Sequence, residues 1–144
     1  MLGRVSLAGQ VLRFHEQLYK RSDGRVGHGM LGVPTLLLRT IGRRSGTTRT
    51  NALVYARDGD SYLVVASNGG ADRPPAWLHN LEADPAVEIQ VGRDRTPATA
   101  RVIEPSNPSY ERLWALVNAN NKDRYTAYQR KTLRPIPVVA VTAS

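Results

Sequence analysis

Residues 34–55 read PTLLLRTIGRRSGTTRTNALVY. An apolar run and an alternating run, joined by a short segment with two glycines, predict two antiparallel strands and the loop between them. Gly42 and Gly46 permit a tight connection with exposed backbone N–H groups, because glycine tolerates a positive φ angle. These N–H groups, the Ser45 hydroxyl and the neighbouring guanidinium groups suit a phosphate or a carboxylate. The alternative is a basic hairpin loop that is exposed to solvent and binds no ligand. On this stretch alone, an anion-binding loop and a solvated loop are equally supported.

Charge is distributed unevenly along this chain of 144 residues, which has a formal net charge of +8. No acidic residue lies between Asp23 and Asp58. The arginines of this segment are Arg25, Arg39, Arg43, Arg44, Arg49 and Arg57. A segment of one sign recruits anions. Nucleic acid is not the expected partner, because the aromatic patterns of RNA-binding modules and a helix-turn-helix signature are missing. Arginine clustered with glycine instead favours bidentate recognition of phosphate or carboxylate.

The composition also limits the class of protein. The chain has no cysteine, so disulfides and thiolate metal sites are excluded. His15, His28 and His79 lack the spacing of metal ligands, and no metal site is expected. No apolar run approaches the ~20 residues of a membrane-spanning helix, and the N-terminus lacks the pattern of a secretory signal. A cytoplasmic protein with one domain over residues 1–144 is therefore expected.

The N-terminal segment predicts an amphipathic helix. Residues 3–21 place Leu7, Val11 and Leu18 among polar residues at roughly helical spacing. A glycine-rich connection follows at residues 22–33. The basic face of the helix would allow a peripheral contact with an anionic membrane, whereas packing on its own domain is the more frequent role of such helices.

In all, six stretches show the patterns of β-strands, including the two on either side of the arginine loop. They cover residues 35–40, 50–56, 61–66, 86–91, 96–103 and 136–141. Asp58 and Gly59 predict a tight turn, and residues 92–95 predict another. Residues 67–70, Ser-Asn-Gly-Gly, end the third strand and form either a flexible turn or a corner where a flat ligand can approach the backbone. Such strands, with helices between them, predict an α+β domain built on a closed or half-closed barrel of about six antiparallel strands.

Two helix patterns interrupt these strands. The first lies between Pro74 and Pro85, because proline suits the first helical turn and the residue before a proline disfavours the helix. The second covers residues 108–118 and precedes a short aromatic stretch at residues 125–129. The apolar stripe of the second helix, interpreted as core, consists of Tyr110, Leu113, Trp114 and Val117.

The side chains that carry chemistry point to a bound cofactor. No Gly-x-Ser-x-Gly motif is present, no histidine stands in a telling arrangement with a serine, and the acidic residues do not pair. An enzyme of this kind would leave the difficult chemistry to its cofactor. A flat, anionic cofactor would match the arginine loop and the glycine-rich strand end, as phosphate-bearing flavins and their analogues do. Rossmann-type NAD binding is not expected, because the GxGxxG fingerprint is absent.

Four blocks of sequence, in the same order, resemble the deazaflavin-dependent nitroreductase family. They are TIGRRSG with RTN (residues 40–51), VASNGGA (residues 65–71), PAWLHNL (residues 75–81), and a Tyr-x-x-Tyr-Gln pattern that continues to Arg-Pro-Ile-Pro-Val (residues 125–138). The resemblance extends over about residues 31–141. Four blocks in order are far more specific than any one of them.

This resemblance implies a split β-barrel related to the FMN-binding barrels, with an N-terminal helix and two or three others. It implies an oxidoreductase whose hydride donor is reduced coenzyme F420, an 8-hydroxy-5-deazaflavin. The residues implied for the cofactor phosphate and the start of its oligoglutamate tail are Arg43, Arg44, Ser45 and Arg49. Those implied for the ring and ribityl chain are Thr50, Asn51, Ala52, Leu53, Val54, Val65, Ala66, Ser67 and Asn68. The following helix would add Ala76, Trp77, Leu78, His79 and Asn80, and Tyr125 would complete the set.

The resemblance also implies the substrate side of the ring, at Ser67, Tyr125 and Tyr128. These residues would orient the acceptor or donate a hydrogen bond to it. The ordinary alternative is a serine that caps a turn and tyrosines that pack with their hydroxyls in water. Lys122 and Val54 stand where the nitroreductase member has tyrosine, so the substrate pocket is expected to differ.

The acceptor implied by the resemblance is a small hydrophobic or aromatic molecule, namely an activated alkene, a quinone or a nitro-aromatic compound. The oligomeric state stays open, and a homodimer is one candidate because barrels of this kind often dimerise. Two other interpretations stay open: an FMN-binding protein of the same fold, and a non-catalytic module that binds anions or lipid with steeply salt-dependent affinity.

Overall fold

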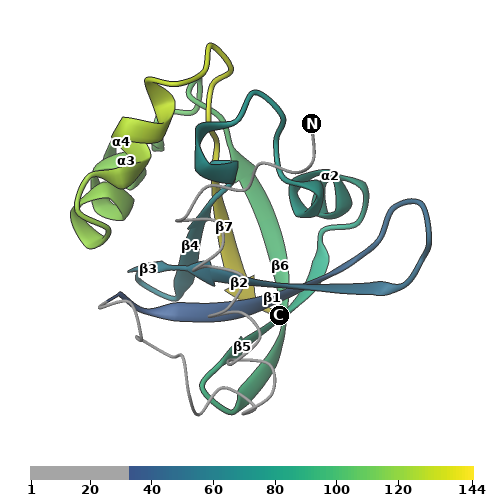
Figure 1. Cartoon of the computed structure of the whole chain (residues 1–144). Coiled ribbons are helices and arrows are strands. Elements are labelled where there is room, and N and C mark those ends of the chain that lie inside the picture. Colours follow the sequence, from purple (N-terminus) through teal and green to yellow (C-terminus); the bar gives the residue numbers. More distant parts are fainter. Residues whose placement is uncertain (1–32) are drawn as a thin grey trace.

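A computed structural model describes residues 33–144, which form one curled sheet with helices beside it (Figure 1). The strands are β1 (Thr35–Ile41), β2 (Thr48–Val54), β3 (Ala56–Asp58), β4 (Ser61–Val65), β5 (Ala86–Val91), β6 (Asp94–Ile103) and β7 (Val138–Ala143). The helices are the short 3-10 helix η1 (Asn68–Gly70), α2 (Ala76–Ala83), α3 (Tyr110–Asn120) and α4 (Arg124–Gln129). The helix expected at residues 3–21, with its membrane contact, lies outside the described residues. Within residues 33–144, no helix is long and apolar enough to cross a membrane.

The sheet has the order β2-β1-β5-β6-β7-β4-β3, and every neighbouring pair is antiparallel. It curls until β2, at one edge, approaches β4 near the other, with Cα atoms within 8 Å of each other. The sheet is therefore a barrel that stays open between β2 and β4, and the predicted α+β fold on a half-closed barrel is confirmed.

Residues 33–144 form seven strands, one more than expected, because the predicted strand at residues 50–56 breaks at Tyr55. Residues before the break pair with β1, whereas Ala56 to Asp58 pair with β4. Tyr55 itself donates its backbone N–H to the Pro34 carbonyl at 3.0 Å. The alternating pattern cannot reveal this break, because both halves keep the alternation while they change partners.

Other boundaries shift for local reasons. β6 begins at Asp94 because Gly92, with a φ of 60°, allows a two-residue turn in place of the four-residue turn expected at 92–95. The last strand begins at Val138 and not at residue 136, after Pro137. The corner expected after the third strand folds into the single turn η1.

Two apolar clusters lie on opposite faces of β4 because consecutive strand residues point to opposite faces. Val64 belongs to the barrel interior, which α2 closes with Trp77 and Leu78. Leu63 and Val65 belong to the second cluster, which α3 and α4 cover. Of the stripe predicted as core in α3, Leu113 and Val117 are buried. Tyr110 and Trp114 are only partly buried, which corrects the prediction that the whole stripe is core.

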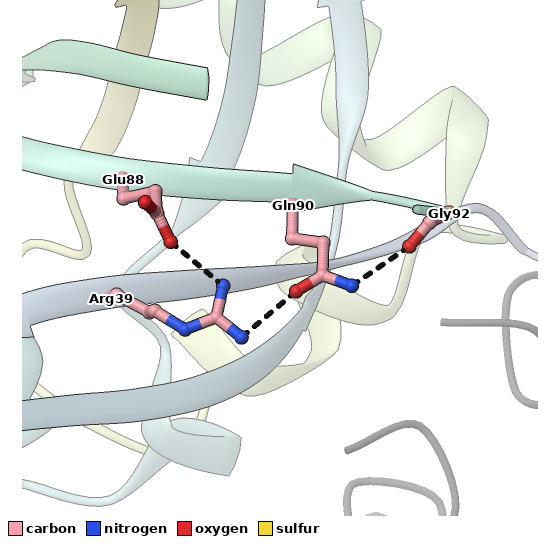
Figure 2. A network of polar contacts seen from close by, with 4 residues as sticks. All are labelled: Arg39, Glu88, Gln90 and Gly92. Atoms are coloured by element: carbon pink, nitrogen blue, oxygen red, sulfur yellow. Dashed lines mark hydrogen bonds and ion pairs between the residues drawn. The ribbon is translucent and has the colours of Figure 1, made fainter. Parts of the chain in front are cut away.

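A polar network joins β1 to β5 on the side of the sheet shown in Figure 2. Arg39 donates through Nη1 to Glu88 Oε1 at 3.1 Å and through Nη2 to Gln90 Oε1 at 2.8 Å. Gln90 is fully buried and donates its amide to the Gly92 carbonyl at 3.0 Å. The Arg39 guanidinium is thus occupied within the sheet, so Arg39 is not among the arginines that are available to bind a ligand.

Candidate functional site

The loop between β1 and β2, residues 42–47, is closed by its own backbone and hydroxyl groups. Gly42 N–H donates to the Thr47 carbonyl at 2.8 Å, and Gly46 N–H, at a residue with a φ of 72°, donates to the Gly42 carbonyl at 2.7 Å. Ser45 Oγ lies 2.8 Å from Thr47 Oγ1 and accepts the Thr47 N–H at 3.2 Å. Ser45, expected as a phosphate ligand, therefore also shapes the loop.

Gly42 is required by space and not by its φ angle. A Cβ at this position would lie 2.7 Å from Ser45 Oγ and 3.2 Å from the Thr47 carbonyl oxygen. The loop thus folds back over a glycine, and a side chain there would push Ser45 away.

Asn80 of α2 ties this loop to the barrel. Its Oδ1 accepts the Arg43 backbone N–H at 3.1 Å and Arg43 Nη1 at 3.5 Å. Its Nδ2 donates to Thr40 Oγ1 at 3.2 Å, and the side chain is buried. Both ends of the amide are therefore used within the protein, so Asn80 holds the loop in position.

Arg44 and Arg49 are exposed, and neither side chain makes a hydrogen bond or ion pair with any residue that the structure describes. Arg57, from the same acid-free segment, lies 4.1 Å from the centre of the Tyr62 ring and donates to the Gly59 carbonyl. With Arg39 and Arg57 occupied, Arg43, Arg44 and Arg49 form the cationic cluster at the loop. A tight loop beside the unpaired guanidinium groups of Arg44 and Arg49 fits a ligand that carries phosphate and carboxylate groups.

The expected ring-facing residues of β2 stand at the open side of the barrel. Thr50, Asn51, Ala52, Leu53 and Val54 are all half-buried, in contrast to the fully buried core of β1. β2 is an edge strand that faces β4 across the opening. Leu53 also packs against the barrel interior.

The end of β4 lies across that opening. Ala66 faces the barrel interior and Val65 faces the α3/α4 side, so the two side chains diverge. Ser67 is buried, and Asn68 is exposed and donates its amide to the Arg73 carbonyl at 2.9 Å.

The predicted residues of α2 divide by face. Trp77 and Leu78 are core residues, whereas Ala76 is exposed. His79 is half-buried, with Nδ1 at 3.3 Å from Glu82 Oε1 on the same helix. The structure therefore brings the arginine loop, β2, the end of β4 and α2 to one side of the barrel (Figure 1).

Tyr125 and Tyr128 lie on α4, on the α3/α4 side. Tyr125 is 6% exposed, with its ring 6.4 Å from Trp114 and 6.3 Å from Tyr128. Burial raises the pKa of the Tyr125 hydroxyl to about 12, against a smaller opposing effect of a hydrogen bond from the Asn121 side chain. The hydroxyl is thus inside the protein. Tyr128 is half-buried, and its carbonyl lies against Gly70 of η1.

Arg134 contacts the end of β4 beside the candidate site, and the sequence alone assigned it no role. Its guanidinium donates to three carbonyls at the end of β4 and after η1, those of Ala66, Ser67 and Ala71. Its position in the fourth sequence block was the one sign in the sequence that Arg134 matters. Its partners could not be predicted, because every residue has a backbone carbonyl.

An open groove of about 380 Å³ also lies between α3 and α4. It is lined by Pro105, Tyr110, Trp114, Thr126, Gln129 and Arg130. The Tyr110 and Trp114 rings stack there at 5.5 Å, and the Tyr110 hydroxyl donates to the Ile136 carbonyl at 2.6 Å. None of the lining residues was predicted for the cofactor.

Known proteins resemble this chain closely. The family model of F420H2-dependent quinone reductases matches residues 11–143. An F420H2-dependent quinone reductase of Mycobacterium tuberculosis is 53% identical over 134 residues, which cover 92% of this chain and 90% of that protein.

Two solved structures are also similar to this chain in fold and sequence. An F420H2-dependent reductase (FDR-A) is 37% identical, with a TM-score of 0.66 over 75% of this chain and 93% of the other. A structure described as a domain-swapped dimer is 32% identical, with a TM-score of 0.68 over 94% and 99%.

These matches confirm the split-barrel fold, the oxidoreductase class and coenzyme F420 as the cofactor implied by the four sequence blocks. The chain belongs to the F420H2-dependent quinone reductase family.

Proposed function

We propose that this protein transfers a hydride from reduced coenzyme F420 to a quinone. The observation that carries the proposal is the arginine cluster at the loop of residues 42–47. The side chains of Arg44, in the loop, and of Arg49, at the start of β2, are unpaired beside an Arg43 anchored by Asn80. A phosphodiester followed by carboxylates is a polyanion that such a cluster suits. Family membership and the charge pattern support the same cofactor.

The chain's own residues would bind and orient the two reactants. Arg43, Arg44, Ser45 and Arg49 would hold the phosphate and the start of the tail. The ring would lie in the opening of the barrel, along residues 50–54 of β2 and residues 65–68 at the end of β4, with α2 beside it. When bound, the reduced deazaflavin supplies a hydride from C5. A quinone that receives this hydride and one proton leaves as the hydroquinone, so electrons and protons balance.

Ser67 is the residue we propose for the acceptor side of the ring. It lies two residues after β4, the strand that faces the opening, and its carbonyl is held by Arg134 Nη2 at 2.8 Å. No hydrogen bond from its hydroxyl to the described residues is observed, so the hydroxyl is available to donate to the acceptor oxygen as charge develops there.

We assign Tyr125 and Tyr128 a more indirect part in the same site. Tyr125 is buried among the aromatic rings of α3 and α4, which supports a role in packing. Tyr128 lies against η1 and would shape the acceptor side through that contact.

The test measures the oxidation of reduced F420 by a panel of acceptors, monitored through the absorbance of F420. We expect turnover with quinones, and the panel should include enones and nitro-aromatic compounds, since either class fits a flat, apolar site. FMN provides the comparison for the cofactor. Tighter binding of FMN than of F420, or no oxidation of reduced F420 by any acceptor, would contradict the proposal.

We also propose a homodimer, supported by the relative described as a domain-swapped dimer. Sedimentation of the purified chain at the mass of a monomer would contradict this.

A further inference from the structure

Arg134 uses its whole guanidinium group on backbone carbonyls. Nε donates to Ala71 at 2.8 Å, Nη1 to Ala66 at 3.2 Å and Nη2 to Ser67 at 2.8 Å. The three acceptors lie before and after η1, so one planar group bridges both ends of this turn. A rigid fork can satisfy three carbonyls at once, whereas a lysine ammonium on its flexible stem has no such fixed geometry.

The turn that Arg134 bridges has an unusual backbone. Asn68, Gly69 and Gly70 follow one another with φ angles of 47°, 66° and 87°. A positive φ is unfavourable for a residue with a Cβ, such as Asn68, and persists where surrounding contacts impose it. The end of β4 therefore depends on contacts from outside the turn.

A second contact holds the turn from the side of α4. A Cβ at Gly70 would lie 2.7 Å from the Tyr128 carbonyl oxygen and 3.1 Å from Tyr128 Cα. The turn is therefore pressed against the end of α4 at a distance that only glycine permits.

The segment that carries Arg134 is itself fixed. Gln129 donates to the Arg134 carbonyl at 2.8 Å and accepts the Ile136 N–H at 2.9 Å. Thr132 donates to Asp72 Oδ1 at 2.7 Å, on the far side of the turn. Arg134 thus reaches the carbonyls from an anchored position.

We infer that Arg134 is a positioning residue, which fixes the end of β4 so that the cofactor ring and Ser67 meet the acceptor in a productive geometry. This inference rests on the proposed function. It separates two tasks: the arginine loop determines how tightly the cofactor binds, and the Arg134 contacts determine how well the ring is aligned.

Arg134→Lys is the primary test, because it keeps the charge and removes the fork. We expect amide hydrogen exchange of the cofactor-free protein to accelerate over residues 66–72 and to stay unchanged in the β5–β6 hairpin. We expect kcat to fall by about tenfold or more, since small misplacements of reacting groups are costly. The Kd for oxidised F420 should change by less than about threefold, because the phosphate and tail contacts remain.

Arg130→Lys is the matched control, since Arg130 is exposed nearby and makes no hydrogen bond through its side chain to the described residues. Its exchange pattern and kcat should equal those of the unmodified protein. Gly70→Ala perturbs the same turn from the α4 side and should reproduce the Arg134→Lys pattern, which also covers the case in which Arg134→Lys does not fold.

The outcomes are distinct. Unchanged exchange at residues 66–72, or an unchanged kcat, in Arg134→Lys overturns the inference while the proposed function stands. A large increase in Kd at constant kcat would also overturn it, because Arg134 would then contribute to binding. An unmodified protein that neither binds nor oxidises reduced F420 would instead remove the proposed function.

Discussion

Replacing Arg44 and Arg49 together with alanine tests the anion site most directly. Both side chains are exposed and make no hydrogen bond or ion pair with the described residues, so their removal should leave the fold and its melting temperature unchanged. Each charge-assisted hydrogen bond to a ligand is worth roughly 1.5–3 kcal/mol. Solvent screens charges at an exposed loop, so we take the lower value for each arginine, about 3 kcal/mol for the pair. This corresponds to an increase of about 100-fold in the Kd for F420.

The assay is fluorescence titration of F420 at several salt concentrations. Affinity should fall with salt in the unmodified protein, and this dependence should be weaker in the double variant, because fewer charges then face the ligand. The deazaflavin that lacks the phosphate and the glutamate tail should bind both proteins equally. Arg57→Ala is the matched control from the same acid-free segment, since Arg57 is occupied by Tyr62 and Gly59.

Two results would refute this reasoning. Unchanged affinity in the double variant would show that the loop does not meet the phosphate or the tail. An equal loss of affinity for the truncated deazaflavin would show that the two arginines act on the ring side or on the fold.

Two further predictions follow from local geometry. Gly42→Ala should raise the Kd for F420 and lower the free energy of unfolding by about 1 kcal/mol, since the new Cβ displaces Ser45 Oγ and its hydrogen bonds. In a protein that already carries Gly42→Ala, Ser45→Ala should lower the free energy of unfolding by less than it does in the unmodified protein. If the effects of the two substitutions were fully additive, this double-mutant cycle would contradict the clash. Tyr125 has a pKa raised from 10.0 to about 12, so its contribution to stability is complete below pH 10 and is lost as the pH rises toward 12. A shift of that size corresponds to about 2–3 kcal/mol, and Tyr125→Phe should flatten the decline in stability between pH 10 and 12 in denaturant titrations, whereas an unchanged slope would contradict the burial of the hydroxyl.

The fold was predictable where the pattern is local. The apolar run in residues 61–66 predicts β4 well, because consecutive residues of β4 face the two clusters, and the alternation in residues 86–91 predicts β5, because Val87 and Ile89 face the barrel interior. The break at Tyr55 was not predictable, since it depends on which strand each half pairs with. The partial exposure of Trp114 was equally unpredictable, because helical periodicity shows which residues share a face but not what covers that face.

The sequence predicts which types of residue gather at the site, but not which of them bond to other residues of the protein and which remain unpaired. The six arginines of the acid-free segment look alike in the sequence, yet Arg39 pairs with Glu88, 49 residues away along the chain. Only the three-dimensional pairing shows that Arg44 and Arg49 remain unpaired. Asn80 was likewise predicted as a cofactor contact, which stays a prediction; nothing in the sequence indicates that its amide also bonds to Arg43 and Thr40.

The four sequence blocks combine into two pairs in the structure. The first and third blocks meet where Asn80 holds Arg43, and the second and fourth meet where Arg134 holds the carbonyls of Ala66 and Ser67. Each pair joins one segment that would touch the cofactor to one that supports it from a distant part of the chain. The contacts of Arg134, and that of Asn80 with the Arg43 N–H, are made to backbone atoms, so the partners' side chains give no hint of them. This explains why the blocks identify the family together and why no single block assigns the work of Asn80 or Arg134.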